Sequence, residues 1–140
     1  MLKCAQKLRN GGQTDGLENV EPQPRRTTRC TVRAITKATG ESWEHAYVGI
    51  CLQGFLMCDM PSNNAIWGAY IRRKGFNKKS IPEDKPDDYT VEDFCRDHPQ
   101  GVFIVTTSGH VLTVQDGDYY DSWNSGKEIP IYYFEREEQK

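Results

Sequence analysis

The sequence lacks several features that would place it in a broad class at once. Its 140 residues contain no uninterrupted apolar stretch long enough for a membrane-spanning helix, so we expect no membrane partner. The first residues, MLKCAQKLRNGGQTDG, lack the apolar core of a secretory signal. The formal net charge of -2 is too small to indicate specific nucleic-acid binding. These absences predict a soluble protein of the cytoplasm.

Paired cysteines and paired metal ligands are also missing from the sequence. The five cysteines, at positions 4, 30, 51, 58 and 95, include no CxxC pair, and an odd number does not fit a secreted disulfide scaffold. The three histidines, His45, His98 and His110, show no ligand spacing such as HExxH. We therefore expect reduced thiols, no metal and no cofactor.

The length and composition fit one compact domain with one core. Residues 8–28 are rich in glycine, proline and polar side chains and show no sustained period. We therefore expect residues 1–26 to be an irregular or mobile lead-in and residues 27–140 to form the single domain.

Apolar stripes, caps and stop residues predict four helices in the first part of the domain. Val32 and Ile35 belong to the first stripe, and Gly40 suits a left-handed helix end. The TVED sequence that starts at Thr90 resembles a capping box for the last helix. The expected helices run from Cys30 to Gly40, from Ser42 to about Met57, from Asn63 to Lys74, and from Thr90 to a residue before Pro99.

The last third of the chain changes its period and is rich in β-branched and aromatic residues. Runs at 102–107, 110–115, 119–123 and 130–136 are divided by turn residues and predict strands. Helices followed by strands are typical of an α+β fold. We expect N-terminal helices packed on one face of a C-terminal antiparallel sheet of about four strands.

Cys30 lies in the first turn of the first expected helix. A cysteine attacks as the thiolate, and a helix N-terminus and a nearby imidazolium both favour that form. Arg29 would add to the positive field beside the sulfur. Most other cysteines in proteins are small buried residues, a description that fits the remaining helical cysteines better: Cys51, Cys58 and Cys95.

His110 follows a Ser-Gly turn and opens an expected strand. Strand alternation puts it on the same face as Leu112 and Val114, which we expect to be the face covered by the helices. A histidine on such a face needs a hydrogen-bonding partner or a function. His110 is therefore the candidate base for Cys30.

The Asp116-Gly117 dipeptide is a two-residue hairpin signal, and it sets the position of the next strand. In that register Asp121 lies diagonally across from His110, within reach of the ring. A three-residue turn would put Asn124 opposite His110 instead, so both residues are candidates for orienting the imidazole. In the two-residue register Trp123 would pack beside His110 and shield it from water.

Three stretches of the domain resemble the small papain-like cysteine peptidase fold. They are RCTVRAITKATG around Cys30, VEDFCRDHPQGVFIV, and SGHVLTVQDGDYYDSW, which holds His110 and Asp121, and together they cover most of residues 27–136. The group includes bacteriocin-leader peptidases, Josephin-type deubiquitinases and compact papain-like proteins of phages and bacteria. The resemblance implies a papain-like fold, a peptide or protein substrate, and a location in a bacterial or phage-infected host cell.

The resemblance further implies a cysteine peptidase or isopeptidase that acts through an acyl-enzyme, with Cys30, His110 and Asp121 as its catalytic residues. Acyl transfer by the same residues would differ only in the acceptor. Relatives carry an oxyanion-hole glutamine a few residues upstream of the nucleophile, whereas the candidate here, Gln23, lies seven residues before Cys30. They often have Asp directly before the nucleophile, where this chain has Arg29. These departures support a second hypothesis, a catalytically inactive papain-like binding module that inhibits a host protein or sequesters a small anionic ligand.

Overall fold

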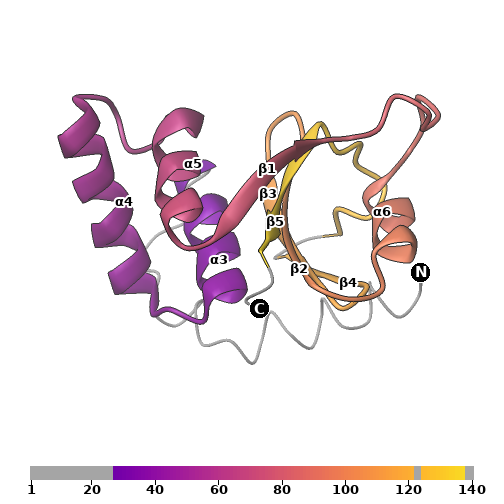
Figure 1. Cartoon of the computed structure of the whole chain (residues 1–140), viewed down its shortest axis with the longest axis horizontal. Helices are drawn as coiled ribbons and strands as arrows, with labels where there is room; N and C mark the ends of the chain where they lie inside the picture. Colours follow the sequence, from indigo (N-terminus) through magenta and orange to yellow (C-terminus); the bar gives the residue numbers. More distant parts are fainter. Residues whose placement is uncertain (1–26, 122–123, 138–140) are drawn as a thin grey trace.

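The computed structural model describes residues 27–121 and 124–137, and only the backbone of residues 27–29. The described chain is α+β, with four helices and one antiparallel five-stranded sheet (Figure 1). The helices are α3 (Thr27–Thr39), α4 (Trp43–Met57), α5 (Asn64–Arg73) and α6 (Val91–Asp97). The strands are β1 (Phe76–Ser80), β2 (Val102–Thr106), β3 (Val111–Gln115), β4 (Asp118–Tyr120) and β5 (Tyr132–Arg136). All four predicted helices and all four predicted strands are present, and the predicted lead-in, 1–26, lies outside the described residues.

Local signals explain where the helices begin and end. The Ser42 side chain accepts a hydrogen bond from an amide of the first turn of α4, and Asn63 does the same for α5. Thr90 and the third residue of α6 form the predicted capping box. Gly40 and Gly75 follow α3 and α5 with φ of 79° and 90°, the left-handed conformation that glycine adopts most readily. Within the described ranges, no helix combines the length and apolar character needed to cross a membrane.

The sheet contains one strand that the sequence did not predict. Its order is β1-β5-β2-β3-β4, so the C-terminal strand lies between β1 and β2. In β1 only Phe76 is buried, and Asn77, Lys78, Lys79 and Ser80 are exposed. This edge strand has neither alternation nor a β-branched run, and its pairing with β5 makes it a strand.

Helices cover both faces of the sheet. Ile104 packs with α3 and α5 in one buried cluster, whereas Phe103 and Val105 pack with α6 in another. Figure 1 shows α3, α4 and α5 on one side of the sheet and α6 on the other. The expectation of helices on a single face is therefore wrong. The short helix α6 lies between β1 and β2 in the chain and packs on the face opposite to α3 and α5.

The hairpin between β3 and β4 has the predicted register. Gln115 pairs with Asp118, and the two residues between them, Asp116 and Gly117, have φ of 51° and 82°. Two positive φ values are the mark of a type I′ turn, whose twist matches that of the strands it joins. This turn fixes the direction in which the chain leaves β4 towards Asp121.

Candidate active site

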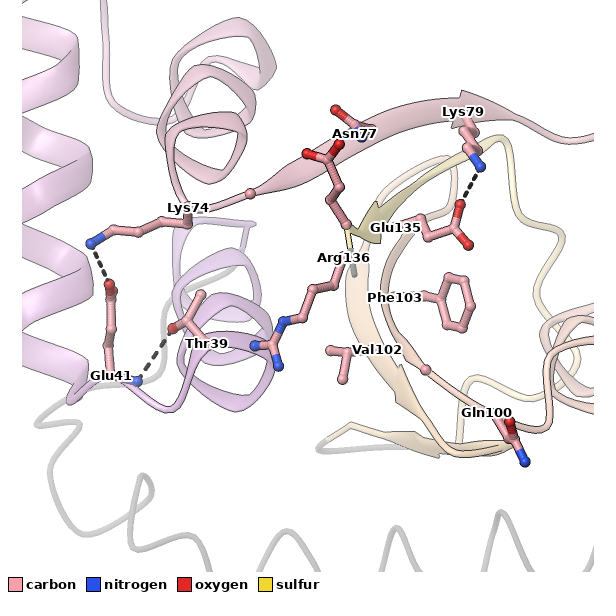
Figure 2. A pocket seen from close by; sticks show the side chains of 13 residues that line it. Thr39, Glu41, Lys74, Asn77, Lys79, Gln100, Val102, Phe103, Glu135 and Arg136 are labelled. Atoms are coloured by element: carbon pink, nitrogen blue, oxygen red, sulfur yellow. Dashed lines mark hydrogen bonds and ion pairs between the residues drawn. The ribbon is translucent and has the colours of Figure 1, made fainter. Parts of the chain in front are cut away.

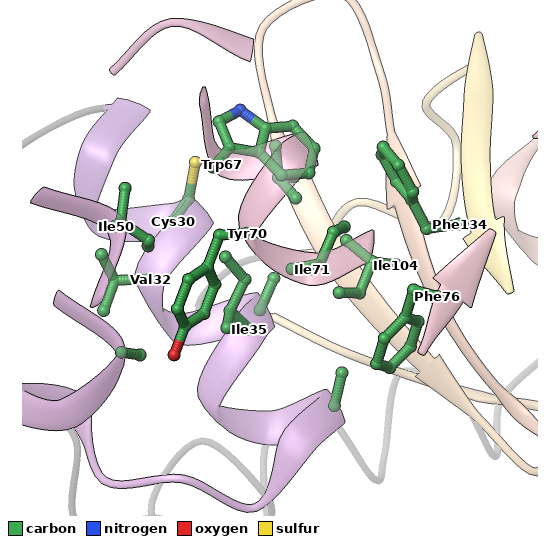
Figure 3. Close-up of a cluster of buried hydrophobic side chains, with 14 of the residues drawn as sticks. Cys30, Val32, Ile35, Ile50, Trp67, Tyr70, Ile71, Phe76, Ile104 and Phe134 are labelled. Atoms are coloured by element: carbon green, nitrogen blue, oxygen red, sulfur yellow. The ribbon is translucent and has the colours of Figure 1, made fainter. Parts of the chain in front are cut away.

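Cys30 is the fourth residue of α3 and is buried, with 5 % of its surface exposed. Its side chain belongs to the cluster that also contains Ile50 and Trp67 (Figure 3). The first turn of α3 contains no acidic residue, so the positive end of the helix dipole is not neutralised from within the helix. The sulfur thus combines a helix N-terminus with a site shielded from water.

Thr113 connects the helix that carries Cys30 to the strand that follows His110. Its hydroxyl donates a 2.6 Å hydrogen bond to the carbonyl of Ala34, and Thr113 is completely buried. Ala34 lies one helical turn after Cys30, and Thr113 lies three residues after His110. This bond therefore limits how far the sulfur and the imidazole can separate.

His110 lies in the tight connection between β2 and β3. The backbone N–H of Thr107 donates to the His110 carbonyl at 2.9 Å, which holds the residue at the mouth of the hairpin. The His110 side chain is buried, and its Nε2 donates to Oδ2 of Asp121. Cys30 also acts on the pKa of this ring, so its sulfur lies close to the imidazole. One ring therefore contacts both of the other predicted catalytic residues.

The pKa of His110 reflects these contacts. Burial alone lowers it, because a charged ring loses hydration. The hydrogen bonds and charges of Asp121 and Cys30 outweigh burial and raise the pKa from 6.5 to about 9. The ring is therefore protonated at neutral pH, and a positive imidazole beside a thiol favours the nucleophilic thiolate.

The carboxylate of Asp121 is held by the loop that follows it. Ser125, which is completely buried, donates a hydrogen bond from its hydroxyl to the same oxygen that accepts from His110. Two first-turn amides of α6 hold the loop in turn, since Val91 N donates to the Glu128 carbonyl and Glu92 N to the Gly126 carbonyl.

Gly126 permits the close approach of this loop to α6. A Cβ at this position would lie 2.7 Å from a carboxylate oxygen of Glu92, a distance that real Cβ contacts do not reach. A larger residue at this position would therefore displace the Glu92 side chain where the loop carrying Ser125 crosses the start of the helix.

His110 lies beside Cys30, but strand alternation is not the reason for this position. Leu112 and Val114 face α6, and it is Val111 that faces α3. The imidazole reaches the sulfur because His110 precedes the first residue of β3 and is not bound to the alternation of the strand. The diagonal position of Asp121 follows from the predicted turn.

The other predicted site residues have different outcomes. Asn124, the alternative to Asp121, is exposed, and its Oδ1 accepts from the Tyr119 hydroxyl at 2.6 Å and from a backbone N–H of the loop at 3.3 Å. It therefore supports the loop and does not orient the ring. Gln23, Trp123 and the side chain of Arg29 lie outside the described residues.

Sequence reasoning missed Ser125 and Thr113. Ser125 lies four residues after Asp121, a spacing that has no special meaning in an irregular loop, and Thr113 occupies an ordinary strand position. Neither residue carries a signal in the sequence, because Thr113 bonds to the distant helix α3, and the loop that returns Ser125 to Asp121 is held by α6. Both positioning residues emerge only from the packing of α3, β3 and the loop.

A large groove lies away from this site. It has a volume of about 1090 Å³ and is lined by the end of α3, by β1 and by β5 (Figure 2). Its charged side chains largely pair with one another, for example Lys74 with Glu41 at 2.7 Å and Lys79 with Glu135. Thr39, which lines it, is about 14 Å along the helix from Cys30. In the described part of the chain no group of three or more His, Cys, Asp or Glu is suited to hold a metal.

Comparison with protein-family models, with curated proteins and with solved structures finds no match to this chain. The functional argument therefore depends on the chemistry of Cys30, His110 and Asp121.

Proposed function

We propose that the protein is a cysteine-dependent peptidase or isopeptidase of the papain-like type, with Cys30 as nucleophile, His110 as proton carrier and Asp121 as the residue that orients the ring. The observation that carries the proposal is the continuous contact from sulfur to imidazole to carboxylate among buried side chains. Two of these residues come from an expected helix start and an expected strand start, which a papain-like arrangement requires.

The proposed reaction follows from this geometry. The sulfur of Cys30 attacks the carbonyl carbon of a peptide or isopeptide bond, and His110 donates its proton to the departing amine. A water molecule, deprotonated by His110, then attacks the acyl-enzyme and releases the acid. Asp121 accepts the hydrogen bond from Nε2 throughout, so Nδ1 is the ring nitrogen left to carry the proton.

The start of α3 supports stabilisation of the oxyanion. The first turn of a helix presents backbone N–H groups that have no intrahelical acceptor, and these groups favour negative charge. Cys30 belongs to that turn, so the carbonyl oxygen of a substrate bound to its sulfur would lie near the helix start. Gln23 remains a sequence prediction for a further donor.

A second candidate function is supported by the burial of the site. Cys30 and His110 are only 5 % and 3 % exposed, so a polypeptide substrate can reach the sulfur only after the covering side chains move. A papain-like module that has lost turnover and instead binds a host protein or a small anionic ligand has no such requirement. The two functions differ in whether Cys30 is needed.

The test is the alkylation of Cys30, measured by peptide mass mapping of the intact chain after brief exposure to iodoacetamide. Cys58 is exposed and lies outside the site, so it serves as an internal reference in the same sample. We expect the ratio of Cys30 to Cys58 labelling to increase as the pH is lowered from 8 towards 6, because an imidazolium keeps the sulfur ionised where an ordinary thiol, with a pKa of about 8.5, is protonated.

His110→Gln should remove this pH dependence, and Cys30→Ala should also abolish capture of a peptide aldehyde. The peptidase proposal is wrong if Cys30 stays unlabelled under all these conditions. It is also wrong if the pH dependence of Cys30 labelling is the same in His110→Gln as in the wild type. A Cys30→Ala protein that keeps its full biological effect would assign the function to the binding module.

A further inference from the structure

The outer face of α4 exposes an unusual amount of apolar surface. The helix packs on α3 and α5 through buried residues such as Ala46 and Ile50. Figure 1 shows it as the outermost helix on its side of the sheet. On the opposite face of the helix, Val48, Leu52, Phe55 and Leu56 are 62 %, 55 %, 78 % and 61 % exposed. We call these four residues the α4 face.

The composition of α4 is that of a helix buried on both sides. No Asp, Glu, Lys or Arg occurs between Ala46 and Cys58. A helix that is apolar all round is normally enclosed by protein, whereas a surface helix carries charge on its outer side. The acidic residues that flank this stretch in the sequence, Glu44 and Asp59, lie at the two ends of the helix and are exposed.

We propose that the α4 face joins two copies of this chain in a symmetric dimer. The four side chains of the α4 face are 55 % to 78 % exposed. Together they present roughly 450 Å² if a large side chain offers on the order of 175 Å². An apolar patch of about 300–600 Å² is often a functional surface. A standard interface buries about 800 Å² on each partner, so the α4 face can supply the apolar core of such an interface.

The spacing of the α4 face is self-complementary, as a two-fold interface requires. Val48, Leu52 and Leu56 are four residues apart and lie along one side of the helix. An antiparallel pair of α4 helices with the two-fold axis beside Leu52 brings Val48 of one copy against Leu56 of the other. The positive end of each helix dipole then lies beside the negative end of the other, which is favourable. Leu52 contacts Leu52 of the second copy at the axis.

The first experiment measures the mass of the full chain by size-exclusion chromatography with light scattering, over a range of concentrations. We expect the wild type to have twice its chain mass of 16.1 kDa and Leu52→Glu to have the mass of one chain. The matched control is Ile131→Glu, because Ile131 is 53 % exposed but lies outside α4. This variant should stay dimeric. Far-UV circular dichroism checks that each variant is folded.

The second experiment tests the position of the axis. Leu52→Lys should be monomeric like Leu52→Glu, since each variant alone brings like charges together. An equimolar mixture of the two should recover the dimer mass, because opposite charges then meet at the axis. A mixture that stays monomeric would overturn the placement of Leu52 at the axis.

Two outcomes would overturn the dimer itself. One is a wild type that is monomeric at every concentration, and the other is a Leu52→Glu variant that keeps the dimer mass of the wild type. A monomeric wild type that floats with phosphatidylcholine vesicles, where Leu52→Glu does not, would assign the α4 face to a membrane surface. None of these results depends on Cys30, so the dimer and the peptidase proposal fail or stand separately.

Discussion

Replacing Asp121 by Asn should return His110 to ordinary titration behaviour. The rise in the pKa of His110 from 6.5 to about 9 corresponds to about 3 kcal/mol in favour of the charged ring, after burial has been overcome. Asp121 and Cys30 both contribute to this rise in the pKa, and Asp121 does so through a hydrogen bond and through its charge. We therefore expect the variant to lower the pKa of His110 by at least about one unit, equal to about 1.4 kcal/mol.

The assay is an NMR titration of the histidine ring carbons. The chain has three histidines, so the spectrum contains few signals, and His110→Gln assigns the relevant one. Asp116→Asn is the matched control, because Asp116 lies in the exposed β3–β4 turn, and Asn retains the oxygen that accepts from Gly101 N. This control should leave the pKa of His110 unchanged. A wild-type value near 6.5, or no response to the loss of Asp121, would refute the proposed charge arrangement.

The same shift makes stability depend on pH. Because the folded protein binds the proton of His110 more tightly than the unfolded chain does, the stabilisation is complete below pH 6.5 and is lost as the pH rises through about 9. The free energy of unfolding should fall by up to about 3 kcal/mol across this window. Urea unfolding at several pH values measures it, and Asp121→Asn should flatten the profile.

Three further substitutions test the packing around the site. Thr113→Val removes the buried hydrogen bond to Ala34, so the free energy of unfolding should decrease by about 1 kcal/mol, and Cys30 alkylation should slow, as urea titration and mass mapping would show. Gly49→Ala places a Cβ 2.4 Å from the buried ring of Tyr70, and this overlap should cost roughly 1 to 3 kcal/mol, more than the helix propensity gained by alanine. Thr90→Ala removes the capping box of α6 and should lower the thermal midpoint, by a free energy of about 1 kcal/mol.

The sequence alone determined the features that depend on neighbouring residues. Helix caps such as Ser42 and Thr90 act on amides two or three residues away, so their positions follow from the local sequence. The Asp116-Gly117 turn likewise fixes the register of β4 and therefore brings Asp121 near His110.

The tertiary structure decided what depends on distant partners. FNKKS becomes strand β1 only because β5 pairs with it, and α6 covers the second face of the sheet because the chain crosses there. Thr113 bonds to a helix far away in the chain, and the loop that carries Ser125 to Asp121 is held by the start of α6. His110 reaches Cys30 from outside the strand ladder, where alternation no longer sets the direction of a side chain. Such contacts arise between segments far apart in the chain, so local propensity carries no information about them.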